Sequence, residues 1–544
     1  MLDRAIVEAL FPADLPEPAY WEQRYPQRQL LESAKVTRFA PSPTGFVHIG
    51  GVYVAMIAKS VAHSSGGVYF VRVEDTDQAR EVEGAAEQFR RAFAYFDIAP
   101  DEADPYGPYH QSQRESIYLT YVRELMCQGK AYPCFATKDE LATMAEEQRA
   151  AKVPTGYYGR WAPWRDAPAE EVLRRLQAGD PYVVRFRSPG HAGRRVSYAD
   201  AIRGEIEQQD NRNDAVILKS SEQPLRLPTY HLAHVVDDHL MRVNLVIRGE
   251  EWISSVPLHL QLFDALGFER PTYAHVALLM KQEDSSKRKL SKRRDPEASV
   301  DFYIRDGFPA PAVLYYLRGL ANGRLAETPL EQALAEPIKL AECGGAGPLV
   351  DLVKLDDISR DFVATLAGPQ VLDEVITWAR RFDPQLVEVI AANRQLAARA
   401  IDVERVGVDN PRKDLAKWSD FRPVYGFFFP ELFAPVVDPA DARLGGLDPA
   451  LVRRMAADFA DGYIEHDDKP TWFSQIRELA ARHGFAPNAK EYKKSPESYP
   501  GSIREAANVV RVALTGSTKS PDLHAVARAL GTDEVLRRVR ALVG

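Results

Sequence analysis

A short strand that leads through a proline-containing turn into a helix limits the folds that this chain can adopt. Residues 36–40 have the pattern of a buried strand, and the two prolines that follow stop it because proline cannot extend a central ladder. A helical pattern begins at Gly51. His48–Gly51 therefore lies at a strand-to-helix junction, where free N–H groups and the helix dipole favour an anion. A lone His-x-Gly turn is also compatible with an ordinary helix cap.

A second feature is a strongly basic segment far downstream. Residues 281–294 hold seven Lys or Arg and two Asp or Glu, and they include the sequence Lys-Leu-Ser-Lys-Arg at 289–293. Taken alone, such a run is typical of a solvated loop or a nonspecific nucleic-acid patch. Two lysines three residues apart can also follow the charge of a triphosphate as it moves during a reaction. Together the two features predict a phosphate site with one half on a helix start and one on a mobile loop.

Five ordered segments give the chain a wider resemblance. They are Thr-Arg-Phe-Ala-Pro-Ser-Pro-Thr-Gly with His-Ile-Gly-Gly (37–51), Arg-Val-Glu-Asp-Thr-Asp (72–77), 227–239, 246–252 and 289–293. In this order they resemble the signatures of the glutamyl-tRNA synthetases, a family of class I aminoacyl-tRNA synthetases. The resemblance is close over residues 36–320 and looser elsewhere. The first signature ends in His-Ile-Gly-Gly, without a second histidine, which removes one phosphate donor.

The resemblance implies a nucleotide site that needs no protein-bound metal. His48, Lys289 and Lys292 are its implied catalytic residues, and Mg²⁺ is expected to arrive on the phosphates of ATP. The implied ATP-binding residues are His48, Gly50, Gly51, Trp252, Lys289, Leu290, Ser291, Lys292 and Arg293.

A glutamate pocket must satisfy two carboxylates and one ammonium, and guanidinium groups suit carboxylates. The resemblance places Arg38 and Tyr230 at the side-chain carboxylate, Arg248 at the α-carboxylate, and Ser42 and Glu74 at the ammonium. His234 occupies a position that varies among relatives, and an interpretation outside direct substrate contact is favoured. From the residues alone, Arg38 also fits an ion pair at a strand edge, and Tyr230 fits a core aromatic.

Alternating strand and helix patterns over residues 36–130 predict a parallel sheet. With the resemblance, the predicted fold class is α/β: a class I Rossmann-type catalytic domain with an inserted α+β acceptor-binding domain, followed by an all-α C-terminal half. The predicted domains are an N-terminal extension at 1–35, the catalytic domain at 36–130 and 215–265, the insertion at 131–214, a stem-contact region with the basic loop at 266–365, and a helical anticodon-binding region at 366–544.

Three local expectations complete this outline. The proline-rich residues 1–35 suggest an extended arm that lies on the body. Glu81–Phe96 and Pro384–Ala400 each have the pattern of a single helix, the second with proline at its first position. The helical C-terminal half disfavours glutaminyl-tRNA synthetases, which are expected to carry β-barrels there.

Composition bounds the compartment and the partners. The 544 residues carry a net charge of −8, and the three cysteines, Cys127, Cys134 and Cys343, form no Cys-x-x-Cys pair. We expect a reduced, cytoplasmic protein without structural zinc. No apolar run reaches the ~18 residues of a membrane span, and the N-terminus lacks the pattern of a secretory signal. Residues 482–519 hold seven Lys or Arg against three Asp or Glu, so an acidic chain can still present a local basic face.

The predicted function is ATP-dependent ligation of L-glutamate to the 3′-terminal adenosine of tRNA, through a glutamyl-adenylate, with release of pyrophosphate and AMP. The expected partners are tRNA(Glu), L-glutamate and ATP, without a membrane, and the expected state is a monomer. Charging of tRNA(Gln) as well stays open. The alternatives are a glutaminyl-tRNA synthetase, a truncated enzyme that glutamylates a tRNA base, an RNA-binding pseudo-synthetase without catalysis, and a smaller nucleotidyltransferase. Intact His48, Lys289 and Lys292 argue against the pseudo-synthetase.

Overall fold

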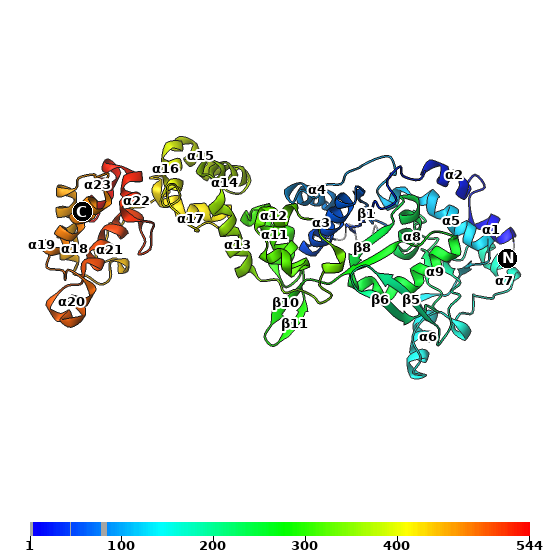
Figure 1. Cartoon of the computed structure of the whole chain (residues 1–544). Coiled ribbons are helices and arrows are strands. Elements are labelled where there is room, and N and C mark those ends of the chain that lie inside the picture. The colour runs from blue at the N-terminus through cyan, green and yellow to red at the C-terminus, as the bar shows by residue number, and fades with distance from the viewer. Residues whose placement is uncertain (1–3, 44, 78–83) are drawn as a thin grey trace. The chain divides into compact units, whose positions relative to one another are not determined.

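The computed structural model describes residues 4–43, 45–77 and 84–544 and divides into two compact units. The first unit comprises residues up to 302 with 314–351, and the second comprises 303–313 with 352–544. All described strands lie in the first unit, and the second is built from helices (Figure 1). The predicted α/β class, with parallel strands followed by a helical C-terminal half, is confirmed.

Parallel strands form the centre of the first unit. β1 (Val36–Phe39) pairs in parallel with β2 (Val68–Val71). A four-stranded sheet has the order β6-β5-β9-β8, in which β8 and β9 are parallel. Its strands are β5 (Arg195–Asp200), β6 (Gly204–Gln209), β8 (Leu245–Gly249) and β9 (Thr272–Val276). The hairpin β5–β6 falls within the segment 131–214, yet it extends the sheet of β8 and β9.

The rest of that segment forms its own small layer. A three-stranded antiparallel sheet has the order β3-β4-β7. Its strands are β3 (Ala131–Cys134), β4 (Val183–Phe186) and β7 (Val216–Leu218), and the helices of the segment are α6 (Lys138–Ala150) and α7 (Ala169–Gln177). Tyr132 donates its hydroxyl to the buried carboxylate of Asp214 at 2.6 Å, which ties β3 to the residues before β7.

The helix after β1 begins two residues earlier than predicted. α3 (Ile49–Ser64) is capped by His48, whose Nδ1 accepts the N–H of Gly50 at 2.8 Å. A Cβ on Gly50 would lie 2.9 Å from His48 Nδ1, and a Cβ on Gly51 would lie 3.0 Å from the ring of Phe39. The two glycines therefore let the helix start pack closely against its own cap and against β1.

The N-terminal segment lies on the first unit, but it is not extended throughout, because residues 4–10 and 18–24 form two helices. α1 (Arg4–Leu10) buries Ile6, Val7 and Leu10 and packs against α5 (Glu115–Cys127) and α7. α2 (Pro18–Arg24) has its proline in the first turn, where the missing N–H needs no partner. Pro18, one of the prolines that suggested an extended chain, thus marks the start of a helix.

Two further expectations are corrected. Part of the basic segment is a hairpin of β10 (Met280–Glu283) and β11 (Ser286–Lys289), and Figure 1 shows it as a projecting ribbon. The single helix predicted from Pro384 breaks at Asn393, whose backbone leaves the helical region, into α15 (Pro384–Ala392) and α16 (Arg394–Asp402). α4 (Ala85–Tyr95) covers the predicted helix after its first residues, which lie outside the described ranges at 81–83.

The remaining helices complete the two units. In the first unit they are α8 (Tyr230–Leu240), α9 (Val256–Leu266) and α12 (Leu330–Ala335), and at the boundary α10 (Val300–Asp306) and α11 (Ala310–Ala321). In the second they are α13 (Leu352–Thr365), α14 (Gly368–Phe382), α17 (Phe421–Tyr425), α18 (Pro449–Gly462), α19 (Lys469–Arg482), α20 (Ala489–Lys494), α21 (Ile503–Thr515), α22 (Leu523–Leu530) and α23 (Thr532–Arg540).

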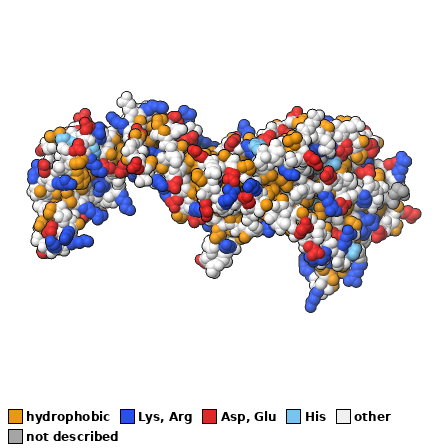
Figure 2. All heavy atoms as spheres, in the orientation of Figure 1, with side chains coloured by type: hydrophobic (Ala, Val, Ile, Leu, Met, Phe, Trp, Pro, Cys, Tyr) orange, Lys and Arg blue, Asp and Glu red, His pale blue; other side chains and the backbone are white. Residues whose placement is uncertain are grey.

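The second unit has one continuous apolar core and a basic edge. Trp472 is fully buried in that core, and Arg538 is buried with its guanidinium donating to the carbonyl oxygens of Leu514 and Phe427. Lys490, Lys493 and Lys494 are exposed on α20, where Figure 2 shows Lys and Arg side chains gathered at one end of the unit.

Candidate active site

A cavity of about 390 Å³ opens at the carboxyl ends of β1 and β8, where ligands of parallel sheets commonly bind. Most of the residues predicted for the site line it: Arg38, Ser42, His48, Gly50, Gly51, Glu74, Tyr230, Arg248, Trp252, Lys289 and Leu290. Residues that the sequence did not suggest also line it, namely Tyr53, Glu251 and the segment Val276–Leu279. Thr44, in the first signature, lies outside the described residues.

Four predicted residues do not line this cavity: His234, Ser291, Lys292 and Arg293. His234 is fully buried behind it, with Nδ1 2.7 Å from Asp238 Oδ2 and Nε2 3.2 Å from the hydroxyl of Tyr273. Burial lowers the pKa of His234 to about 3, so the ring is neutral. His234 therefore adjoins the wall of the cavity from inside the protein.

The helix start forms one wall with a neutral histidine. Burial lowers the pKa of His48 to about 4, and the positive charge of Lys292 adds to this lowering. Because His48 Nδ1 accepts from Gly50, the neutral ring carries its proton on Nε2. That proton and the positive end of the α3 dipole suit an anionic oxygen.

The basic segment reaches this wall through two lysines. Lys292 donates from Nζ to the carbonyl oxygen of Phe46, in the turn before α3. Lys289 Nζ lies 3.9 Å from Glu251 Oε1 at the rim of the cavity, with both side chains about half exposed. The segment is held by Asp295, which accepts two bonds from Arg288, at 2.6 and 2.7 Å, and the N–H of Ser291 at 2.8 Å.

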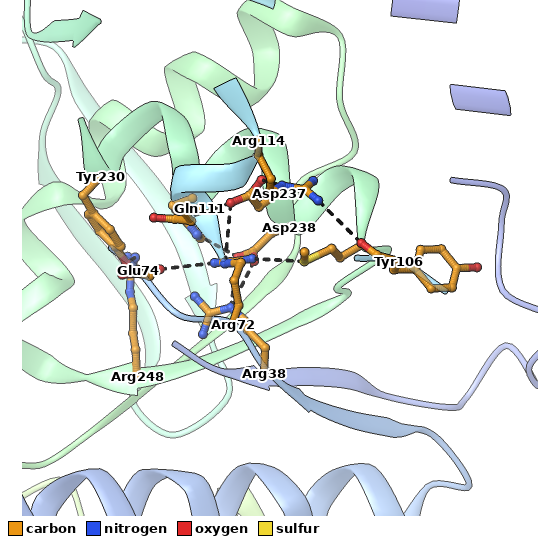
Figure 3. Close-up of polar contacts among 12 residues, drawn as sticks. Arg38, Arg72, Glu74, Tyr106, Gln111, Arg114, Tyr230, Asp237, Asp238 and Arg248 are labelled. Carbon is orange, nitrogen blue, oxygen red and sulfur yellow. Dashed lines mark hydrogen bonds and ion pairs between the residues drawn. The ribbon is translucent and has the colours of Figure 1, made fainter. Parts of the chain in front are cut away.

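A buried ion network supports the opposite wall. Arg38 Nε lies 3.1 Å from Asp238 Oδ1, and Arg72 Nη1 lies 2.5 Å from the same oxygen. Figure 3 shows Arg72 between Asp238 and Glu74, whose Oε1 accepts from Arg72 Nη2 at 3.3 Å. Asp238 thus compensates two arginine charges at once, and it holds Arg38 against the cavity.

The carboxylate of Glu74 has a pKa near neutral pH. Burial raises the pKa of Glu74 to about 7, although the charges of Arg72 and Arg38 act in the opposite direction. A cationic group that entered the cavity beside Glu74 would favour the ionised form. An ammonium ligand would therefore stabilise the ionised carboxylate of Glu74.

Arg248 presents its guanidinium to the cavity from the end of β8. Its Nη1 donates to the hydroxyl of Tyr230 at 3.2 Å, and its Nε donates to His275 Nε2 at 3.1 Å. The ring of Tyr230 lies 4.2 Å from that of Trp252, centroid to centroid, so an aromatic pair flanks the guanidinium. Arginine, tyrosine and the nearby Arg38 can together bind the carboxylates of a small acidic ligand.

Sequence reasoning missed the residues that orient these side chains. Asp238 lies inside a quoted motif but was given no role, and Asp200, His259 and His275 were not considered. The signal in the sequence is that Asp238 stands beside a second aspartate in the segment that forms α8. Once such an aspartate is buried, it needs arginine partners. The pairing of Asp200 with His275 needed the register between β5 and β9, which no sequence pattern shows.

No candidate metal site or membrane span occurs in the described ranges. There, no three His, Cys, Asp or Glu side chains come together in a way that could hold a metal ion. Cys134 instead lies 3.4 Å from the hydroxyl of Tyr157 and 3.3 Å from Arg185 Nε. None of the described helices combines the length and the hydropathy of a membrane-spanning segment.

Known proteins match both units of the chain. Residues 35–331 match the tRNA synthetases class I (E and Q), catalytic domain, and residues 501–543 match an anticodon binding domain. A glutamate–tRNA ligase of Clostridium perfringens (strain 13 / Type A) is 40% identical over 98% of this chain and 99% of its own length. One of Sorangium cellulosum (strain So ce56) is 38% identical, over 96% of this chain and 97% of its own.

A solved structure agrees with these matches. The crystal structure of a glutamate tRNA ligase from Elizabethkingia meningosepticum CCUG26117, in complex with its amino acid, is 25% identical, with a TM-score of 0.74. The alignment covers 94% of this chain and 99% of that chain. The resemblance predicted from five motifs is thereby confirmed, and the chain belongs to the glutamate–tRNA ligases of the class I tRNA synthetase family.

Proposed function

We propose that the cavity between α3, β8 and the Lys289–Arg293 segment is where this chain activates L-glutamate with ATP before transfer to tRNA. The observation that carries the proposal is the composition of the cavity wall. Arg38, Arg248, Tyr230 and Glu74 line the same cavity as His48 and Lys289. The first set suits an amino acid with two carboxylates, and the second suits phosphate.

The reaction needs positioning and charge stabilisation more than proton transfer. The α-carboxylate of glutamate is already a nucleophile, so attack on the α-phosphorus of ATP requires no general base. His48, the first turn of α3, Lys289 and Lys292 would stabilise the charge that moves onto pyrophosphate. The remaining predicted ATP contacts are Gly50, Gly51, Trp252, Leu290, Ser291 and Arg293. Mg²⁺ would enter as part of the substrate, bound to the phosphates.

The glutamate side of the pocket follows from the same wall. Arg38 with Tyr230 would bind the side-chain carboxylate and Arg248 the α-carboxylate, while Ser42 and Glu74 would bind the ammonium. His234 would act from behind Tyr230, whose ring it stacks against at 5.7 Å between centroids.

Transfer to tRNA would involve the rest of the chain. We assign the 3′ end of the acceptor stem to residues 131–214, the stem to 266–365 and the anticodon to 366–544. The match of 501–543 to an anticodon binding domain supports the last assignment. The cognate partner would be tRNA(Glu), and recognition of tRNA(Gln) as well depends on the anticodon contacts. We further propose that the protein is cytoplasmic and monomeric. Light scattering of the purified protein tests the monomeric state.

Charging assays test this function. Purified protein, MgATP and purified tRNA(Glu) or tRNA(Gln) are incubated with labelled L-glutamate or L-glutamine, and acid-precipitable tRNA is counted. We expect labelled glutamate on tRNA(Glu). Charging with glutamine alone would indicate a glutaminyl-tRNA synthetase, and tRNA binding without charging of either would indicate a pseudo-synthetase.

A further inference from the structure

Arg248 differs from the other arginines around the cavity in the nature of its partners. Arg38 and Arg72 are paired with the carboxylate of Asp238. Arg248, in contrast, has no carboxylate partner within ion-pair distance among the described residues, although its side chain is largely buried. An arginine is always protonated in proteins, so this guanidinium keeps an uncompensated positive charge.

One partner of Arg248 is His275, whose other ring nitrogen contacts the carboxylate of Asp200. His275 Nε2 accepts from Arg248 Nε at 3.1 Å, and His275 Nδ1 lies 2.7 Å from Asp200 Oδ2. Asp200 is itself fixed, because its Oδ1 accepts the backbone N–H groups of Ile202 and Arg203 at 3.0 Å. The carboxylate therefore places the ring proton on Nδ1 and leaves Nε2 as an acceptor.

A second histidine, His259 on helix α9, also directs a ring nitrogen at Arg248, but its partner is another histidine. His259 Nδ1 lies 3.4 and 3.3 Å from Arg248 Nη1 and Nη2, and its Nε2 lies 3.0 Å from His231 Nδ1. Burial lowers the pKa of the imidazole rings of His231, His259 and His275. The pKa of His231 falls to about 4, and that of His259 falls well below its usual value. These rings are therefore neutral, and two of them direct an acceptor at one guanidinium.

We propose that Asp200, His275 and His259 are positioning residues that hold Arg248 through neutral acceptors and so reserve its charge for a carboxylate of glutamate. A carboxylate in direct contact with Arg248 would fix its orientation equally well but would compete with the substrate. Placing the carboxylate of Asp200 behind an imidazole gives the orientation without that competition. This inference rests on the proposed function, because it assigns Arg248 to substrate binding.

The sharpest test compares two nearly isosteric replacements of His275. His275→Gln keeps a neutral acceptor near the position of Nε2, whereas His275→Glu places a charge there. The readout is the KM for glutamate and kcat in tRNA charging, with the KM for ATP measured alongside. We expect His275→Glu to raise the glutamate KM about 10–100-fold more than His275→Gln, the range seen when groups that orient a ligand-binding residue are lost. Equal glutamate KM values would overturn the proposal.

Asp200 is tested through its dependence on His275. In Asp200→Asn the amide can donate to His275 Nδ1, which moves the ring proton to Nε2 and opposes the N–H of Arg248. We expect a raised glutamate KM with little change in kcat or in the KM for ATP. Asp200→Asn should add much less in the His275→Gln background, since the glutamine does not depend on Asp200. Full additivity, or a matching loss in kcat and ATP affinity, would show a merely structural role.

Controls separate failure of this inference from failure of the proposed function. Asp264, on α9, is the exposed ion-pair partner of Arg270. Asp264→Asn should leave kcat and the KM values for glutamate and ATP unchanged. Thermal unfolding verifies that each variant folds, and if Asp200→Asn does not fold, the two His275 variants decide. If Arg248→Ala also leaves the glutamate KM unchanged, the assignment of the pocket fails. If Arg248→Ala raises it and the His275 pair does not differ, the positioning role alone fails.

Discussion

Arg38 and Asp238 face each other in the protein interior, with Arg38 Nε 3.1 and 3.2 Å from the two carboxylate oxygens and almost no exposure of either side chain. The same carboxylate lies 2.5 Å from Arg72. One aspartate therefore sets the position of a residue in the cavity wall and also compensates the buried charge behind it. The stability and the function of this region depend on the same contact.

Removing this carboxylate should be strongly destabilising. Asp238→Ala removes the carboxylate that pairs with the buried Arg38. The change leaves Arg72 with its longer contacts to Glu74 and Asp237. Losing one partner of a buried pair costs about 3–5 kcal/mol. Thermal unfolding should show a clearly lower midpoint than for the wild type. Asp264→Ala, which breaks an exposed pair, serves as the control and should change the midpoint little. Equal midpoints for both variants would contradict the role of Asp238.

Glutamate binding should weaken as the pH falls below about 7. Burial raises the pKa of Glu74 to about 7, and only the ionised form attracts the substrate ammonium. Protonation therefore removes the binding form on the acidic side, and kcat/KM for glutamate should fall about tenfold per pH unit well below the pKa. His48 stays neutral throughout because its pKa is about 4.

The matched variant for this prediction is Glu74→Gln. It should have a raised glutamate KM and should lose the acidic limb of the profile between pH 6 and 8, since no group titrates at that position. A wild-type profile that is flat over this range, or an unchanged acidic limb in the variant, would contradict the assignment of Glu74.

Replacing Lys292 should reduce activation without unfolding the protein. Lys292 is exposed, and its Nζ donates to the carbonyl oxygen of Phe46 in the turn before α3. If it stabilises the departing pyrophosphate, Lys292→Ala should lower glutamate-dependent pyrophosphate exchange about 10²–10³-fold, the scale for one preorganised contact. Lys287→Ala, on the exposed hairpin strand β11, is the control and should keep activity. Near-normal exchange for Lys292→Ala would remove it from the site.

The exposed lysines of α20 should contribute to tRNA binding. A variant with Lys490, Lys493 and Lys494 changed to alanine should bind tRNA more weakly, with no change in the KM for glutamate. Each lost phosphate contact should reduce the slope of log K against log salt by about 0.7–0.9. Filter binding at several salt concentrations measures this slope. An unchanged slope would identify the helix as an ordinary solvated surface.

The sequence predicted the motifs and the class of fold better than the residues that support the site. The strand–turn–helix junction at His48 followed from local rules of proline, glycine and helix starts, and only its boundary moved, because His48 itself caps the helix. The α2 helix was missed because proline suits a first helical turn as well as an extended chain. The α1 helix contains no proline and was missed as a short element of seven residues.

Long-range pairing was beyond the reach of sequence patterns. Asp200 and His275 are 75 residues apart and meet through the pairing of β5 with β9. The compensation of Arg38 by Asp238 likewise joins residues 200 positions apart. The resemblance identified Arg248 as a candidate. The neutral state of its histidine partners follows from their burial, and the tautomer of His275 follows from its contacts, so both require the structure.

We propose that Arg248 binds glutamate in the cavity where ATP reacts, and pyrophosphate exchange measures this binding through its dependence on glutamate. Wild-type protein and Arg248→Ala are assayed with MgATP, labelled pyrophosphate and a series of L-glutamate concentrations, with tRNA(Glu) present and absent. We predict glutamate-dependent exchange by the wild type, and for Arg248→Ala a strongly raised glutamate KM or no exchange, with unchanged ATP binding. Equal glutamate KM values for the two proteins would contradict the account.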